Sequence, residues 1–202
     1  MSKIEVDTIE PQSGTTVTLG ASGDTITVPS GTTLNVSSAT LSGITQGITI
    51  ADQWRLSASA NSGTDADVTS NWERNDTTGY GKIGTGLSES SGIFSFPLTG
   101  VYLIIFSPVL EIASGDSFAD VYMKITTDNS TYNNAIRIKL GNRPTSGDTR
   151  VSPTNTFIFN VTNITNDKFK FTTSDFATNT VLLGATDSNR TSFSAIRLGD
   201  SV

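Results

Sequence analysis

The sequence has no cysteine and no histidine among its 202 residues. Without cysteine, a chain forms no disulfide framework and no thiolate-ligated zinc site. Without histidine, it lacks the commonest general base and the commonest metal ligand. The absence of these two residue types excludes most familiar catalytic mechanisms, so we expect a protein that is not an enzyme.

Positive charge is also scarce, with 13 Lys and Arg residues against 19 Asp and Glu residues and a formal net charge of -6. Phosphate binding needs an excess of basic residues, so we expect no nucleic-acid partner. No apolar run approaches the roughly 20 residues of a membrane-spanning helix. The opening residues hold no apolar segment of the kind found in secretory signals. We therefore expect no membrane insertion and synthesis in a cytoplasm.

The pattern that is present is short-range alternation of apolar and polar residues, bounded by Gly, Asn, Asp, Ser and Pro. This alternation is typical of an all-β fold. From residue 51 the alternating segments lengthen and aromatic residues become frequent. About eight to ten such segments predict a two-sheet sandwich of jelly-roll type over residues 51–202.

Before residue 51, a triplet of one apolar, one polar and one apolar residue occurs three times, and Ser-Gly pairs separate the copies. Its six apolar side chains are Val17, Leu19, Ile26, Val28, Leu34 and Val36. Their full burial contributes about 9 to 18 kcal/mol, whereas ordering residues 13–44 costs about 1 to 2 kcal/mol per residue. The segment cannot fold alone, so we predict that residues 13–50 form a β-repeat stalk built from several copies of the chain.

A continuous apolar run at residues 101–106 predicts a strand that is dry on both faces. The simplest explanation for burial of the second face of this strand is that it packs against other copies of the chain in a trimer. We therefore place Tyr102 and Ile104 at that interface, together with the six side chains of the stalk.

Two segments resemble the C1q/TNF-like domains. Residues 94–106, FSFPLTGVYLIIF, match that family's aromatic strand, Pro-x-x-Gly turn and Val-Tyr strand, and residues 191–198, TSFSAIRL, match its closing strand, with Ala195 in place of the usual Gly. The resemblance implies a ten-stranded jelly roll that assembles as a tight trimer around an aromatic-lined axis, without catalytic activity.

The start of the chain resembles fibre and other virion proteins of tailed bacteriophages, especially those of marine cyanobacteria. The resemblance rests on residues 3–11, KIEVDTIEP, and on the repeats at 16–20 and 31–36. It implies that residues 1–12 are an arm that attaches to other virion proteins, with Ile4, Val6 and Ile9 as the contacts. It also implies that the protein ends up in the virion.

Several polar segments hold candidate binding residues. Trp72, Tyr80 and Tyr132 lie among Asn, Thr and Gly, where an exposed ring can stack on a sugar, and Arg143 is a candidate for contact with an anionic glycan. Asp65 and Asp67, with Asp76, are candidate oxygen ligands for Ca²⁺, but the segment lacks a full ligand loop. Otherwise we expect no cofactor.

We interpret the chain as a homotrimeric phage tail fibre or spike whose head adheres to a glycan or protein of the host surface. Three alternatives stay open. The first is a capsid decoration or a structural spike without a receptor, and the second is a non-viral bacterial adhesin. The third is a glycan-cleaving tailspike, which needs a pair of acids such as Glu111 with Asp116, or Asp65 with Asp67.

Overall fold

The computed structural model describes residues 8–34, 47–141, 147–177 and 179–202. The chain divides into two units, Met1–Ile44 and Thr45–Val202, which we describe separately. Residues 8–34 of the first unit contain no strand and no helix. Their backbone hydrogen bonds to one another close two local turns, from Asp24 N to Ala21 O and from Thr32 N to Pro29 O.

The apolar side chains of this first unit are exposed in the single chain. Five of the six predicted stalk residues are between 41% and 69% exposed, namely Val17, Leu19, Ile26, Val28 and Leu34, and Ile9 of the predicted arm is 60% exposed. Ile4, Val6 and Val36 lie outside the described residues. The short strands predicted here do not form within the described part of one chain, so the stalk and the arm stay predictions about several copies.

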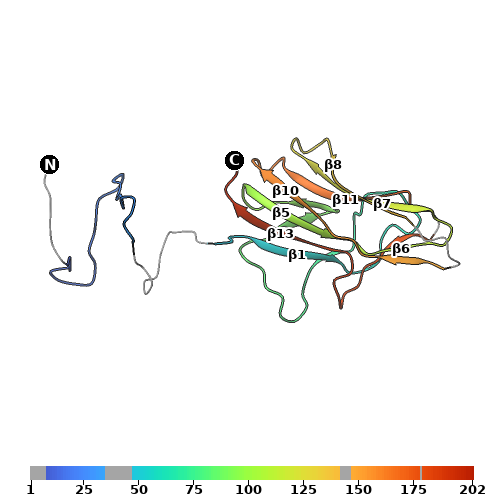
Figure 1. The fold of residues 1–202 in the computed structure, drawn as a ribbon, viewed down its shortest axis with the longest axis horizontal. Coiled ribbons are helices and arrows are strands. Elements are labelled where there is room, and N and C mark those ends of the chain that lie inside the picture. Colours follow the sequence, from blue (N-terminus) through green and yellow to red (C-terminus); the bar gives the residue numbers. More distant parts are fainter. Residues whose placement is uncertain (1–7, 35–46, 142–146, 178) are drawn as a thin grey trace. The chain divides into compact units, whose positions relative to one another are not determined.

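The second unit is a sandwich of two five-stranded antiparallel sheets with a small third sheet (Figure 1). The first sheet has the order β10 (Asn155–Val161), β5 (Gly100–Ser107), β13 (Ser192–Gly199), β1 (Ala51–Leu56), β2 (Trp72–Arg74). The second has the order β3 (Ser88–Ser90), β4 (Ile93–Ser95), β11 (Lys168–Ser174), β7 (Phe118–Thr126), β8 (Asn133–Gly141). The third has the order β12 (Val181–Leu182), β6 (Leu110–Ile112), β9 (Thr149–Val151). The prediction of an all-β sandwich is confirmed.

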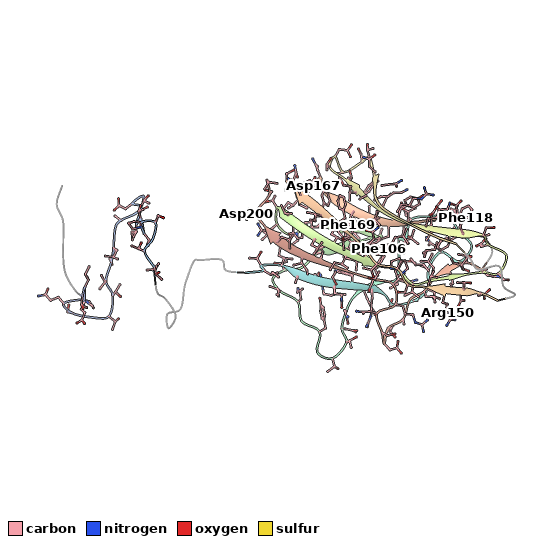
Figure 2. All side chains as sticks on the ribbon, viewed as in Figure 1. Phe106, Phe118, Arg150, Asp167, Phe169 and Asp200 are labelled. Carbon is pink, nitrogen blue, oxygen red and sulfur yellow. The ribbon has the colours of Figure 1, made fainter. Side chains whose placement is uncertain are left out.

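The core between the two large sheets is rich in aromatic rings. The Phe94 ring lies at the centre, with its centroid 4.7 Å from that of Phe193, 5.1 Å from Phe169 and 5.4 Å from Trp72. Phe106 and Phe169 lie between the sheets (Figure 2) and are fully buried. Ile50, which the sequence interpretation assigns to the stalk, is also buried in this core.

The turn that leads into β5 requires glycine at position 100 of the jelly-roll motif. Gly100 has a φ of 150°, which residues with a side chain rarely adopt. A Cβ at this position would collide with the Arg197 side chain and with the carbonyl of Gly199. The Pro-x-x-Gly turn thus needs glycine so that β5 and β13 can pair closely.

Within the described residues, no helix is long and apolar enough to cross a membrane.

Candidate functional site

An apolar row crosses the outward face of the first sheet. Ile158 on β10 pairs with Leu103 on β5, and Leu103 pairs with Ile196 on β13. Ile196 pairs with Ala51 on β1, which bridges to Ile83. Ile158 is 61% exposed and Ile83 is 46% exposed, while the other three are half-buried. We call these five residues the apolar row.

The sheet face around the apolar row carries no charge at its neighbouring outward positions. The next row along the strands consists of Thr156, Ile105 and Ser194. Beyond Leu103 in the other direction, Asn160 pairs with Val101. Charged residues are depleted at the centres of protein interfaces, and exposed apolar patches rimmed by polar residues mark interaction sites. This face therefore has the chemistry of a self-association surface.

The structure corrects the predicted interface positions on β5. Tyr102 and Ile104 are fully buried within the single chain, and the Tyr102 hydroxyl donates a hydrogen bond to the Leu98 carbonyl at 2.9 Å. The outward side chains are instead Val101, Leu103 and Ile105. The prediction was wrong by one position because an unbroken apolar run does not reveal which alternate set points inward. The second face is half-buried, and not dry, in one chain.

Trp72, predicted as a receptor contact, belongs to the core. It is 8% exposed, and its ring centroid lies 5.1 Å from that of Phe171. Its indole Nε1 donates a hydrogen bond to the Val68 carbonyl at 3.0 Å. The ring is therefore unavailable to a receptor, and this prediction was wrong.

Tyr80 takes part in a buried polar network around Asp52. The Tyr80 hydroxyl donates to the Asp52 carboxylate at 2.7 Å, and Arg74 Nε and Leu87 N donate to it at 3.0 and 2.8 Å. Burial raises the pKa of Asp52, but the hydrogen bonds from Arg74, Tyr80, Leu87 and Trp54 outweigh it and leave this pKa below its ordinary value. Burial and the bond to Asp52 raise the pKa of Tyr80 to about 12. The network fixes the β1 edge of the apolar row.

The other predicted contact residues have different surroundings. Tyr132 is half-buried, and its ring lies 4.2 Å from Lys170 Nζ. Arg143 lies outside the described residues.

The acids considered for catalysis are each engaged with other partners. Glu111 pairs with Arg150, and Asp116 accepts hydrogen bonds from Ala177 N and the Thr180 hydroxyl. None of these partners is a second carboxylate, but Asp116 lines one hollow together with Asp65 and Asp175, so the glycosidase alternative stays open.

The acids considered for Ca²⁺ also have protein partners. Asp65 accepts from Phe176 N, Asp67 pairs with Lys170, and Asp76 pairs with Arg55. No group of three acids in the described part of the chain is arranged to hold a metal ion. Calcium at Asp65 and Asp67 stays a prediction.

Sequence reasoning missed a charged face on the second sheet. Five cations lie on three adjacent strands, namely Lys124, Arg137, Lys139, Lys168 and Lys170. The signal was present in the alternation of Lys168 and Lys170 with Phe169, and of Arg137 and Lys139 with Ile138. The two outer faces of the sandwich therefore differ, since the first carries the apolar row, with Arg55 and Glu73 paired to each other farther along β1 and β2, and the second carries five cations.

Comparison with known proteins identifies the fold. No protein-family model matches the chain, and no curated protein matches it. The structure of Eiger TNF from S. frugiperda superposes with a TM-score of 0.60 at 14% identity, covering 78% of this chain and 96% of that one. The second unit has a TNF-like jelly-roll fold. Murine APRIL superposes on the same jelly roll with a TM-score of 0.54 at 12% identity, covering 74% of this chain and 98% of its own. The fold implied by the C1q/TNF-like motifs is thus confirmed.

Proposed function

We propose that this protein is a homotrimeric bacteriophage virion fibre or spike. Its arm attaches to other virion proteins, its repeat forms an interwoven stalk, and its jelly-roll head adheres to the host surface. One observation carries the proposal: the head leaves an uncharged apolar row open on one sheet. A second and a third copy of the chain are the occupants that we assign to this face.

The TNF-like jelly-roll fold, shared with Eiger TNF, is the scaffold on which we place this assembly. Ile158 and Ile83 lie at opposite ends of the apolar row. A contact between different parts of one row on neighbouring copies is heterologous, and such contacts form a closed ring when the rotation between copies closes. A closed ring of three would cover the row on every copy.

The first unit supports a stalk that needs several copies. Leu19, Ile26 and Leu34 are each at least 60% exposed in one chain. We assign their cover to the same segment of neighbouring copies, and a trimeric head would hold three such segments in register. Attachment at one end and three weak sites at the other would give adhesion by multivalency.

Immunogold electron microscopy of purified phage particles tests the virion assignment. Antibodies against the head should label the tail or its base on particles of the phage that encodes the chain. Absence of label from particles whose lysate contains the protein would contradict the proposal. Label confined to the capsid would favour the decoration alternative.

A further inference from the structure

A repulsive pair of lysines lies on the outward face of the second sheet. Lys124 on β7 is directly opposite Lys170 on β11. Like charges in opposite positions of an antiparallel pair destabilise a sheet. Among the described residues, Asp67 is the carboxylate that offsets this repulsion, and it forms its ion pair with Lys170, so the Lys124 ammonium keeps a charge that an external anion can neutralise.

The cations of this face differ in how far the protein neutralises them. Arg137 and Lys139 share the buried carboxylate of Asp120, and Lys170 Nζ lies 2.7 Å from Asp67. The Lys124 ammonium group, in contrast, makes no hydrogen bond or ion pair with any described residue, and it lies 5.9 Å from the Tyr122 ring centroid. Lys168 donates only to the neutral Asn129 amide oxygen, so Lys124 and Lys168 are the two cations of this face without a carboxylate ion pair in the described part of the chain, and Lys124 is the one that lines a hollow.

The tyrosines of this face also have unused hydroxyl groups. The hydroxyls of Tyr80 and Tyr102 are hydrogen-bonded within the head. Those of Tyr122 and Tyr132 make no hydrogen bond to a residue that the structure describes, and both rings are half-buried beside cations. These two rings offer an apolar surface and a free polar tip, which is the usual form of an aromatic contact at a binding site.

Of these groups, Tyr122 and Lys124 line a hollow of about 370 Å³, together with Asn134, Thr172 and Asp65. This volume is within the range of about 300 to 1,000 Å³ that ligand pockets occupy. The lining provides a cation for an anion, a ring for a flat apolar surface, and amide, hydroxyl and carboxylate groups for hydroxyl donors and acceptors. A sugar ring with a carboxylate substituent presents all of these complements at once.

We propose that this hollow binds acidic residues of a polysaccharide, with Lys124 pairing the sugar carboxylate and the Tyr122 ring lying against the sugar face. The Asp65 carboxylate and the Asn134 amide would bond the sugar hydroxyls. This deepens the adhesion function proposed above and rests on it. On a trimer, three hollows would share one polysaccharide and raise its retention through multivalency.

A nucleic acid fits the same hollow less well. Asp65 lies in its lining, and Asp67 and Asp120 lie along the same face. These carboxylates would repel a continuous row of phosphates, whereas an acidic polysaccharide alternates its charges with hydroxyl groups. The formal net charge of -6 adds to that repulsion.

Binding of defined oligosaccharides to the full chain tests the proposal. The probes are hexamers of galacturonic acid and of galactose, which differ in the carboxylate, and a single-stranded DNA of equal charge. Isothermal titration at about 0.05 M salt should show binding of the galacturonate hexamer and at least tenfold weaker binding of the other two. Lys124→Gln should weaken galacturonate binding about tenfold, because it removes a charged hydrogen bond. Tyr122→Ala should weaken it about fivefold.

The matched control is Lys82→Gln, which removes the same charge from an exposed loop lysine that donates to the Thr85 carbonyl. It should leave binding unchanged. Unchanged thermal unfolding of Lys124→Gln would show that the variant is folded. Equal binding of galacturonate by the unmodified chain and Lys124→Gln would overturn the proposal, as would binding of DNA as tight as that of galacturonate. If the labelled protein adheres to host cells but does not bind galacturonate, the result would contradict this inference alone. If it does not adhere to host cells at all, the result would contradict the proposed function.

Discussion

Replacing Ile158 by lysine separates assembly from folding. Ile158 is 61% exposed in the single chain, so a lysine there can extend into solvent and should cost the isolated head little. Full burial of an isoleucine contributes about 1.5 to 3 kcal/mol. If a partner buries the exposed part of Ile158, the gain in binding free energy is therefore about 1 to 2 kcal/mol at this position. Three copies give about 3 to 5 kcal/mol per trimer, or a roughly 100- to 10,000-fold change in the trimer dissociation constant. Desolvation of the ammonium group adds to that loss.

Size-exclusion chromatography with light scattering, over a range of concentrations, measures this change. We expect Ile158→Lys to elute as a monomer at concentrations where the unmodified chain is a trimer, with an unchanged circular dichroism spectrum. The matched control is Ile164→Lys, at another exposed isoleucine, 43% exposed in the turn between β10 and β11. It should stay trimeric. A trimeric Ile158→Lys with unaltered concentration dependence would refute the assignment of the apolar row to the interface.

Two further variants test the interior of the head. Trp72→Ala should lower the free energy of unfolding by about 3 to 5 kcal/mol in urea titrations, because the ring is buried among aromatic partners, and a loss below about 1 kcal/mol would show that the ring is not part of the core. Asp52→Asn should lower it by about 1 to 3 kcal/mol near neutral pH, since the carboxylate accepts hydrogen bonds from Arg74 and Tyr80. The folded-state pKa of Asp52 lies below the ordinary value of 3.8, so its contribution is complete above about pH 4 and is lost as the pH falls through the folded value. The variant should lose less stability than the unmodified chain between about pH 4 and pH 2, and equal losses would contradict this role.

The sheets of the head could be predicted from sequence because period-two alternation records which face of a strand is buried. The segments at 136–140 and 169–171 gave their inward side chains correctly, as the burial of Ile136, Ile138, Phe169 and Phe171 shows. Where both faces are apolar, this record is lost. In β5 the inward set became clear only from pairing, since Tyr102 lies beside Phe159 in the register with β10.

Contacts between distant segments decided the candidate sites, and alternation does not encode them. Trp72 follows a polar loop and resembles an exposed ring in sequence, but its strand carries it beneath Phe94 and Phe171. Likewise, Lys124 and Lys170 are far apart in the chain, and only the register of β7 with β11 brings them together. Single-strand patterns therefore located the core but did not locate the surfaces that we propose for binding.

Native mass spectrometry of the full, unmodified chain tests the central claim most directly. The chain has a mass of 21.3 kDa, and we expect a dominant species of three times that mass at micromolar concentration. A dominant species of one chain mass, under conditions where the head is folded, would contradict the account.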